Sequence, residues 1–294
     1  MDVHESRQQA LAEEFEARRP RLRAVAYRML GSFSEADDAV QEAWLRLSRT
    51  DADDIDNLTA WLTTVVSRIC LDQLRARTAR REESLESRFP DPAVSAAGDS
   101  DPEEQAFRAD SIGLAMLVVL DELSPAERLA FVLHDLFVLP YADIAPIVER
   151  SADATKMLAS RARRRVQGAR AVPDPDLARQ RVAVDAFQAA ARDGDFDALL
   201  RVLDPDVVLR NATAQGLTVV RGAAAVASGA ITFQRLALES HPVLVNGAVG
   251  VVVVIDGEAY SLAAFTVVDD RIVEMDIITD RARLRDLGAA ALVL

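Results

Sequence analysis

The chain has 294 residues, which is too long for one small domain and predicts two or three compact units. Half of its residues are hydrophobic and 28% are charged, an ordinary globular composition. A single cysteine, Cys70, excludes an intrachain disulfide and is typical of a reducing cytoplasm. The N-terminal sequence lacks the apolar segment of a secretion signal, and no apolar run is long enough to span a bilayer as a helix. We therefore expect a soluble, cytoplasmic protein without a membrane partner.

The net charge of −13 argues against a nucleic-acid-binding protein, because phosphate binding needs Lys and Arg. The charge is unevenly distributed, however. Residues 61–81 carry a local net charge of +4, and residues 150–170 carry +6. Two basic patches on an acidic chain favour two separate DNA contacts, although two solvated helix faces would give the same pattern.

Residues 10–81 are predicted to be helical throughout. Apolar residues recur at helical spacing from Leu22 to Leu30, and Gly31 ends that run. Ser34, with Asp37 three residues later, resembles a capped helix start. After an acidic, turn-rich break over residues 51–57, a third helix begins at Leu58. A bundle of three to four helices follows from this pattern, and we call it the first helical domain.

Residues 82–106 are rich in Pro, Asp, Ser and Gly, lack a sustained period and are predicted to form a linker. Residues 107–170, the second helical domain, contain a capping box that starts at Ser124. A helix before residue 149 and a basic helix after residue 151 form a helix-turn-helix pattern. This copy has Glu149 at the place of the usual turn glycine, and Pro146 interrupts the first of the two helices.

After a second linker over residues 171–177, residues 178–294 predict an α+β domain, which we call the C-terminal domain. Two helices, 182–191 and 196–203, precede strands at 207–211, 241–247, 249–256, 259–270 and 271–280. Hairpin turns are expected at Gly247, at Asp256-Gly257 and at Asp269-Asp270. The last three strands should form a meander whose apolar residues face a helical layer.

The order of these units points to a known family. Residues 34–47 and 60–75 closely resemble region 2 of extracytoplasmic-function RNA polymerase sigma factors, and residues 126–133, 154–156 and 161–165 resemble region 4. The remaining residues are similar to the SnoaL-like domain that a SigJ-like subset of this family carries. The resemblance implies a multidomain fold: two all-α sigma domains followed by an α+β SnoaL-like cone.

Three motifs of the SigJ-like subset are altered in this chain. Residues 211–216 replace an Asp-Gly-Gly-Gly-Lys loop, residues 89–92 (Phe-Pro-Asp-Pro) replace a Trp-Leu-Pro-Glu-Pro linker, and residues 279–281 match an Asn-Pro-Asp-Arg-Leu motif only in part. We therefore do not carry over to this chain the interdomain contacts that these motifs make in the subset.

The resemblance implies contacts with core RNA polymerase and with the −10 promoter element. The helix surface that would dock onto the clamp helices of the polymerase β′ subunit consists of Asp37, Asp38, Gln41 and Glu42. A solvated helix start is the alternative reading of these residues. For the −10 element, the candidates are Asn57 for a base edge and Arg68 and Arg75 for phosphates.

The basic helix of the second helical domain should enter the major groove of the −35 element, while this domain contacts the polymerase β flap. Four residues near its start are candidates for base contacts: Ala152, Asp153, Thr155 and Lys156. Four arginines further along are candidates for phosphate contacts: Arg161, Arg163, Arg164 and Arg165.

The C-terminal domain is expected to regulate the sigma factor rather than to catalyse a reaction, with no catalytic residue, metal or cofactor. Its candidate pocket residues are Asp206, Asn211, His241 and Asp276, and a small ligand could occupy this pocket. The alternative is a helix-turn-helix module fused to a SnoaL-like isomerase, cyclase or hydrolase, although no acid–base pair stands out in the spacing.

Overall fold

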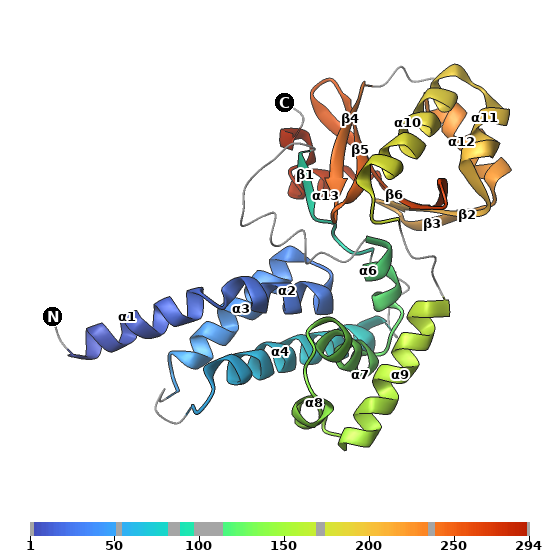
Figure 1. Cartoon of the computed structure of the whole chain (residues 1–294). Helices are drawn as coiled ribbons and strands as arrows, with labels where there is room; N and C mark the ends of the chain where they lie inside the picture. Colours follow the sequence, from blue (N-terminus) through green and yellow to red (C-terminus); the bar gives the residue numbers. More distant parts are fainter. Residues whose placement is uncertain are drawn as a thin grey trace. The chain divides into compact units, whose positions relative to one another are not determined.

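The computed structural model of the protein describes residues 3–50, 55–81, 89–96, 114–168, 174–234 and 239–292. The chain divides into two compact units (Figure 1). Unit 1 comprises Met1–Leu85 and Val119–Ala169, and unit 2 comprises Glu86–Val118 and Arg170–Leu294. Residues 89–96, which lie between the two helical domains in sequence, therefore belong to the same unit as the C-terminal domain.

The first helical domain consists of α1 (Val3–Glu16), α2 (Arg19–Leu30), α3 (Phe33–Leu47) and α4 (Leu58–Arg81). As predicted, Gly31 ends α2, because its φ of 71° is a left-handed conformation that glycine adopts without strain. The predicted start of α3 at Ser34 is wrong. Ser32 has the extended backbone of an N-cap residue, and its hydroxyl lies 3.1 Å from that of Ser34.

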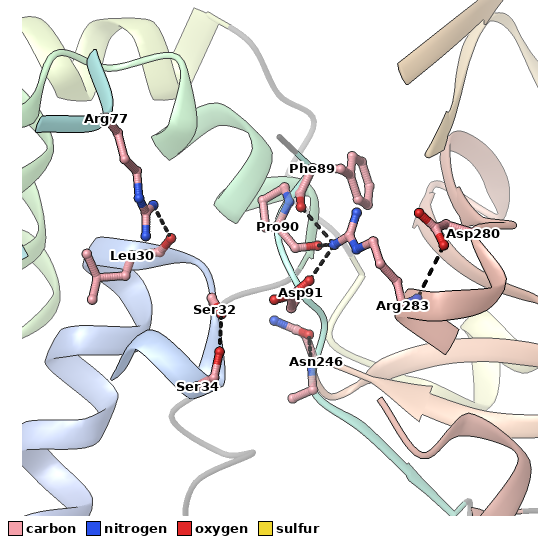
Figure 2. Close-up of polar contacts among 11 residues, drawn as sticks. Leu30, Ser32, Ser34, Arg77, Phe89, Pro90, Asp91, Asn246, Asp280 and Arg283 are labelled. Atoms are coloured by element: carbon pink, nitrogen blue, oxygen red, sulfur yellow. Dashed lines mark hydrogen bonds and ion pairs between the residues drawn. The ribbon is translucent and has the colours of Figure 1, made fainter. Parts of the chain in front are cut away.

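One arginine of α4 joins three helices of this domain. Arg77 donates a hydrogen bond of 3.0 Å to the carbonyl of Leu30, at the end of α2, as Figure 2 shows. Its guanidinium also forms an ion pair with Glu35 of α3. Because the last carbonyls of a helix have no partner within the helix, Arg77 satisfies one of them while it binds a carboxylate.

The second helical domain contains α6 (Leu114–Asp121), α7 (Pro125–Phe131), the π-helical turn η2 (Val132–Leu136), α8 (Tyr141–Val148) and α9 (Ala152–Gly168). The predicted capping box is confirmed at the start of α7, where Ser124 and Glu127 bind each other's backbone amides. Pro146 lies inside α8, and Glu149 ends that helix with a φ of 58°. A residue with a Cβ thus occupies the left-handed turn position that usually holds glycine.

Unit 2 is built on a seven-stranded sheet with the strand order β1-β4-β5-β6-β7-β2-β3. The strands are β1 (Val94–Ala96), β2 (Leu203–Thr213), β3 (Gly216–Arg221), β4 (Glu239–Val245), β5 (Ala248–Ile255), β6 (Glu258–Val268) and β7 (Arg271–Ile278). The predicted strands and the meander of the last three are confirmed. All three predicted hairpin turns have two consecutive residues of positive φ, as tight turns between antiparallel strands require.

Helices α10 (Leu177–Asp193), α11 (Phe196–Val202) and α12 (Ala223–Gln234) lie on one side of this sheet (Figure 1). Phe187 of α10 packs in the same apolar cluster as Val251 of β5 and Phe265 of β6. The short helix α13 (Arg281–Asp286) and the 3-10 turn η3 (Ala289–Leu292) follow β7. No helix within the described ranges has the length and apolarity needed to cross a membrane.

The sequence did not predict β1, β3, α12 or α13. Strand β1 differs most from expectation, because it lies in a segment that was predicted to be a linker. It pairs antiparallel with β4, with Val94 opposite Val245 and Ala96 opposite Val243. A three-residue strand whose partner is about 150 residues away leaves no local pattern, so only the folded sheet reveals it.

Candidate functional sites

The exposed surface of α3 carries the residues predicted to bind core polymerase. Asp37, Asp38 and Gln41 are exposed, whereas Ala36, Ala39, Val40, Ala43 and Leu47 form the buried side of the helix. Asp37 pairs with Arg23 of α2 at 2.7 Å, and Glu42 pairs with Arg46 at 3.0 Å. Asp38 and Gln41 are therefore the two predicted residues that are exposed and form no ion pair with another described residue.

Sequence reasoning missed one residue of this surface. Leu45 is 40% exposed and follows Gln41 by four residues, so it lies on the same helix face as Asp38 and Gln41. An exposed apolar side chain on a helix face that also carries acids is typical of a protein-binding surface, where apolar contacts supply affinity and charges supply orientation. The alternation of buried alanines along α3 was the signal that would have identified it.

The predicted −10 contacts lie on and just before α4. Asn57 is the N-cap residue of this helix, and its Oδ1 accepts a hydrogen bond of 3.0 Å from the amide of Ala60. Arg68 and Arg75 are exposed and lie seven residues apart, which places them on one face of α4. Arg75 also forms an ion pair with Asp72 of the same helix, at 3.7 Å.

The predicted −35 contacts lie on α9, where some of them are exposed and others are buried or bound within the domain. Ala152, Asp153 and Lys156 are exposed near the start of the helix. Thr155 is completely buried and its hydroxyl donates to the carbonyl of Ser151, so its predicted contact with a base edge is wrong. Its position on the same helix side as Ala159 and Ala162 explains this burial.

The four arginines of α9 also fall into two groups. Arg163 binds Asp135 at 2.6 Å and Arg165 binds Glu127 at 3.0 Å, both within the second helical domain. Arg161 and Arg164 are exposed. Between them and Lys156 lies Met157, a 56% exposed apolar residue that sequence reasoning passed over.

The two helical domains contact each other within unit 1 through a buried arginine of α7. Arg128 is 2% exposed; its Nε donates to the carbonyl of Arg28 in α2 at 3.1 Å, and its Nη1 donates to Asp121 at 3.2 Å. Its Nη2 is buried without a hydrogen-bond partner among the described residues. Burial lowers the pKa of Arg128 to about 10, against the opposing effect of Asp121.

Further contacts extend this interface between the two helical domains. The guanidinium of Arg28 lies 4.7 Å from the centroid of the Phe137 ring. Arg68, a predicted DNA contact on α4, donates to the carbonyl of Pro146 in α8 at 3.4 Å. The α4 face that carries Arg68 is therefore in contact with the second helical domain.

In unit 2, the linker segment is held by an arginine of α13. Figure 2 shows Arg283 pointing at the backbone of residues 89–91. Its Nη2 donates to the carbonyls of Phe89 at 2.8 Å and Pro90 at 3.1 Å, and it forms an ion pair with Asp91. Asp280 caps the start of α13 through the amides of Ala282 and Arg283, so the altered motif at 279–281 positions this arginine.

A second contact holds the linker two residues further on. The amide of Ala93 donates to Oδ1 of Asn246 at 2.7 Å, and the amide of Asn246 donates back to the carbonyl of Ala93 at 2.7 Å. Asn246 lies in the β4–β5 turn and is 3% exposed. The contacts that these motifs make in the SigJ-like subset were not carried over to this chain, yet the Phe-Pro-Asp-Pro segment is bound by the C-terminal domain, through two backbone carbonyls and the carboxylate of Asp91.

The four candidate pocket residues of the C-terminal domain do not converge. Asp206 is exposed. Asn211 pairs in register with Ile277 and so shares the sheet face that α10–α12 cover, where its Oδ1 accepts from the Thr279 hydroxyl at 3.0 Å. Asp276 pairs with Ala264, and His241 pairs with Val252. Because side chains alternate along a strand and the adjacent Phe265 and Val251 face the helices, Asp276 and His241 lie on the opposite face of the sheet. The predicted grouping of these residues around one pocket is wrong.

Asp276 is part of a structural ion-pair cluster. Its side chain is 2% exposed and lies 3.0 Å from Arg210, which also contacts Glu274 at 3.3 Å. Burial by itself would lower the pKa of Arg210, but the two carboxylates outweigh it and raise that pKa above its usual value. Because the Asp276 carboxylate is buried and bound to Arg210, it is poorly placed to contact a substrate.

Comparison with known proteins identifies the two helical domains. Residues 15–80 match the Sigma-70 region 2 model, and residues 114–166 match the Sigma-70 region 4 model. The chain is 44% identical to the ECF RNA polymerase sigma factor SigJ of Mycobacterium tuberculosis over 196 residues, which span 66% of this chain and 62% of that protein. It is 37% identical to the probable ECF sigma factor SigI of the same organism over 215 residues, 73% of this chain and 74% of SigI.

The crystal structure of M. tuberculosis SigJ covers 93% of this chain, with a TM-score of 0.74 and 33% identity, and 98% of its own chain is matched. This similarity extends over the C-terminal domain, whose helices and curved sheet have the predicted SnoaL-like α+β fold. The chain belongs to the extracytoplasmic-function RNA polymerase sigma factors, the proteins that direct transcription initiation at specific promoters, and its two helical domains are sigma regions 2 and 4.

Proposed function

We propose that this sigma factor binds core RNA polymerase through the exposed face of α3, with Asp38, Gln41 and Leu45 at its centre. The β′ clamp helices and, for region 4, the β flap are the partner surfaces. The acids orient the encounter with a basic surface, and the leucine supplies apolar area. Asp37 and Glu42 flank this centre, each in an ion pair that must open or be shared on docking.

Promoter DNA is bound at two places in this proposal. Asn57, Arg68 and Arg75 face the −10 element from α4, and α9 enters the major groove of the −35 element with Lys156 toward base edges and Arg161 and Arg164 toward phosphates. Arg163 and Arg165 mainly fix α9 to its own domain, because both bind carboxylates of region 4.

The contact between regions 2 and 4 makes the described conformation of unit 1 a closed form. The two promoter elements are about 25 base pairs apart, roughly 85 Å along B-DNA at 3.4 Å per base pair. In the structure, Arg68 of α4 touches α8, and Arg128 of α7 reaches the α2 backbone. Both DNA contacts cannot form at that spacing while the domains touch, so initiation requires that they separate.

The C-terminal domain tunes this opening by holding the linker that joins the two regions. The observation that carries the proposal is the capture of residues 89–96 by Arg283, Asn246 and strand β4. Each contact that must break before the linker changes its path lowers the fraction of molecules competent to initiate. Releasing the linker should therefore raise transcription.

The test is run-off transcription with core RNA polymerase and the full chain. Arg283→Ala removes the bonds to residues 89–91, whereas Arg281→Ala removes a neighbouring arginine of α13 whose ion pair with Glu258 is long, at 3.8 Å, and exposed. We expect Arg283→Ala to raise transcript yield several-fold and Arg281→Ala to leave it unchanged. Equal yields from both variants would refute control through the linker.

A catalytic role for the C-terminal domain is not favoured. Its acid, amide and imidazole candidates lie on opposite faces of the sheet, and Asp276 is held by Arg210. The domain acts in this proposal as a regulatory part of a cytoplasmic transcription factor, and a small ligand between the helices and the sheet would act by changing its grip on the linker. Turnover of any substrate by the full chain would contradict the non-catalytic role.

A further inference from the structure

Helix α9 presents a regular outward stripe. Its buried side is formed by Thr155, Ala159, Ala162 and Val166, at the spacing of one helix face. Met157 lies two residues after Thr155 and two before Ala159, so it points away from the domain core. It is 56% exposed and stands in the centre of the surface that Asp153, Arg161 and Arg164 share.

The surroundings of Met157 indicate what it contacts. Lys156 precedes it, and the exposed Arg161 and Arg164 follow one and two helical turns later, so the apolar side chain lies within a surface suited to phosphates. A helix whose flanks bind phosphates places its central stripe against the base edges of the major groove. The one apolar group on those edges is the C5-methyl group of thymine.

We propose that Met157 is a specificity-determining residue that contacts the C5-methyl group of a thymine in the −35 element. This inference rests on the proposed entry of α9 into the major groove. Methionine suits this contact, because its unbranched, flexible thioether chain can adjust its conformation to pack against a methyl group in the groove. Lys156, the preceding residue, would donate hydrogen bonds to the acceptor atoms of an adjacent base.

The experiment uses holoenzyme formed from the full chain and core RNA polymerase. A duplex library with a randomised −35 segment is selected by binding, and the selected duplex is then synthesised with each thymine replaced in turn by deoxyuridine, which lacks only the methyl group. We expect one position at which this replacement weakens wild-type binding about fourfold, which corresponds to ~0.8 kcal/mol for one buried methyl group.

The variants then assign that methyl contact to a residue. Met157→Ala should bind the thymine and deoxyuridine duplexes equally well, and Met157→Leu should retain most of the difference. Lys156→Ala should keep the full methyl difference while its preference changes at a neighbouring position. Because Met157 and Lys156 are exposed, we expect these variants to melt at the wild-type temperature.

Two outcomes separate this inference from the proposal beneath it. If Arg164→Ala weakens binding to all duplexes and lowers the salt dependence, but Met157→Ala keeps the fourfold methyl difference, then α9 enters the groove and the assignment to Met157 is wrong. If Arg164→Ala leaves binding unchanged on every duplex, the placement of α9 itself is refuted. Wild-type holoenzyme without any methyl-sensitive position would also overturn the assignment.

Discussion

Replacing Arg283 by alanine should loosen the linker segment at residues 89–96 without unfolding the C-terminal domain. Arg283 binds two linker carbonyls and the carboxylate of Asp91, and the side chains of this ion pair are each 23% exposed. Hydrogen bonds to a charged group contribute about 1.5–3 kcal/mol. Because each 1.4 kcal/mol is a tenfold change in an equilibrium constant, local opening of the linker should become about 10- to 100-fold more frequent.

Amide hydrogen exchange of Ala93 measures this opening. Its amide is bonded to Asn246, two residues beyond the Asp91 ion pair, so it exchanges when the linker leaves the sheet. Arg281→Ala is the matched control, because it makes the same substitution in the same helix at an exposed pair. The reasoning fails if Ala93 exchanges at the wild-type rate in Arg283→Ala, or if both variants accelerate it equally.

Three further predictions concern single residues of unit 1 and of α10. Leu45→Ala should weaken binding to core polymerase about tenfold, whereas Leu177→Ala, which truncates a similarly exposed leucine (39%) on α10, should not. If titration with core polymerase gives equal affinities for the two variants, the α3 surface is not the binding site. Burial raises the pKa of the Cys70 thiol to about 12, so iodoacetamide at pH 8 should modify Cys70 at least ~100-fold more slowly in the native protein than in denaturant. Mass spectrometry measures both modification rates, and comparable rates would contradict the prediction. Glu149→Gly should raise the free energy of unfolding by about 1 kcal/mol because it relieves a left-handed residue, whereas Glu149→Ala should give no such gain; denaturant titration distinguishes them.

The helical domains were predictable because their signals are local. Gly31 and the Ser124 capping box mark helix ends through bonds to residues four or fewer positions away, and the structure has both. Exposure within a helix was less predictable. Thr155 has the chemistry of a DNA contact but lies on the buried side of α9, while Met157 has the chemistry of a core residue but lies outside. The helical spacing of the neighbouring alanines predicts which side of α9 is buried, whereas residue type alone does not.

The candidate pocket failed as a prediction for a related reason. Residues chosen for their chemistry were Asp206, Asn211, His241 and Asp276, yet adjacent strands place the last two on the face away from α10–α12. Because side chains alternate along a strand, a shift of one residue in register changes the face. Register depends on pairing between distant strands, so sequence inspection of a single strand could not fix it.

By itself, the sequence determined the order of the domains, most of their helices and strands, and the family, because these depend on local periodicity and on extended matches. The tertiary structure alone decided that residues 89–96 are part of the C-terminal sheet and that Arg128 and Arg283 hold their partners from far along the chain. These contacts link residues about 100 to 190 positions apart through backbone carbonyls. Because every residue has a backbone carbonyl, no sequence motif predicts such a hydrogen bond, and only folding brings the donor and the acceptor together.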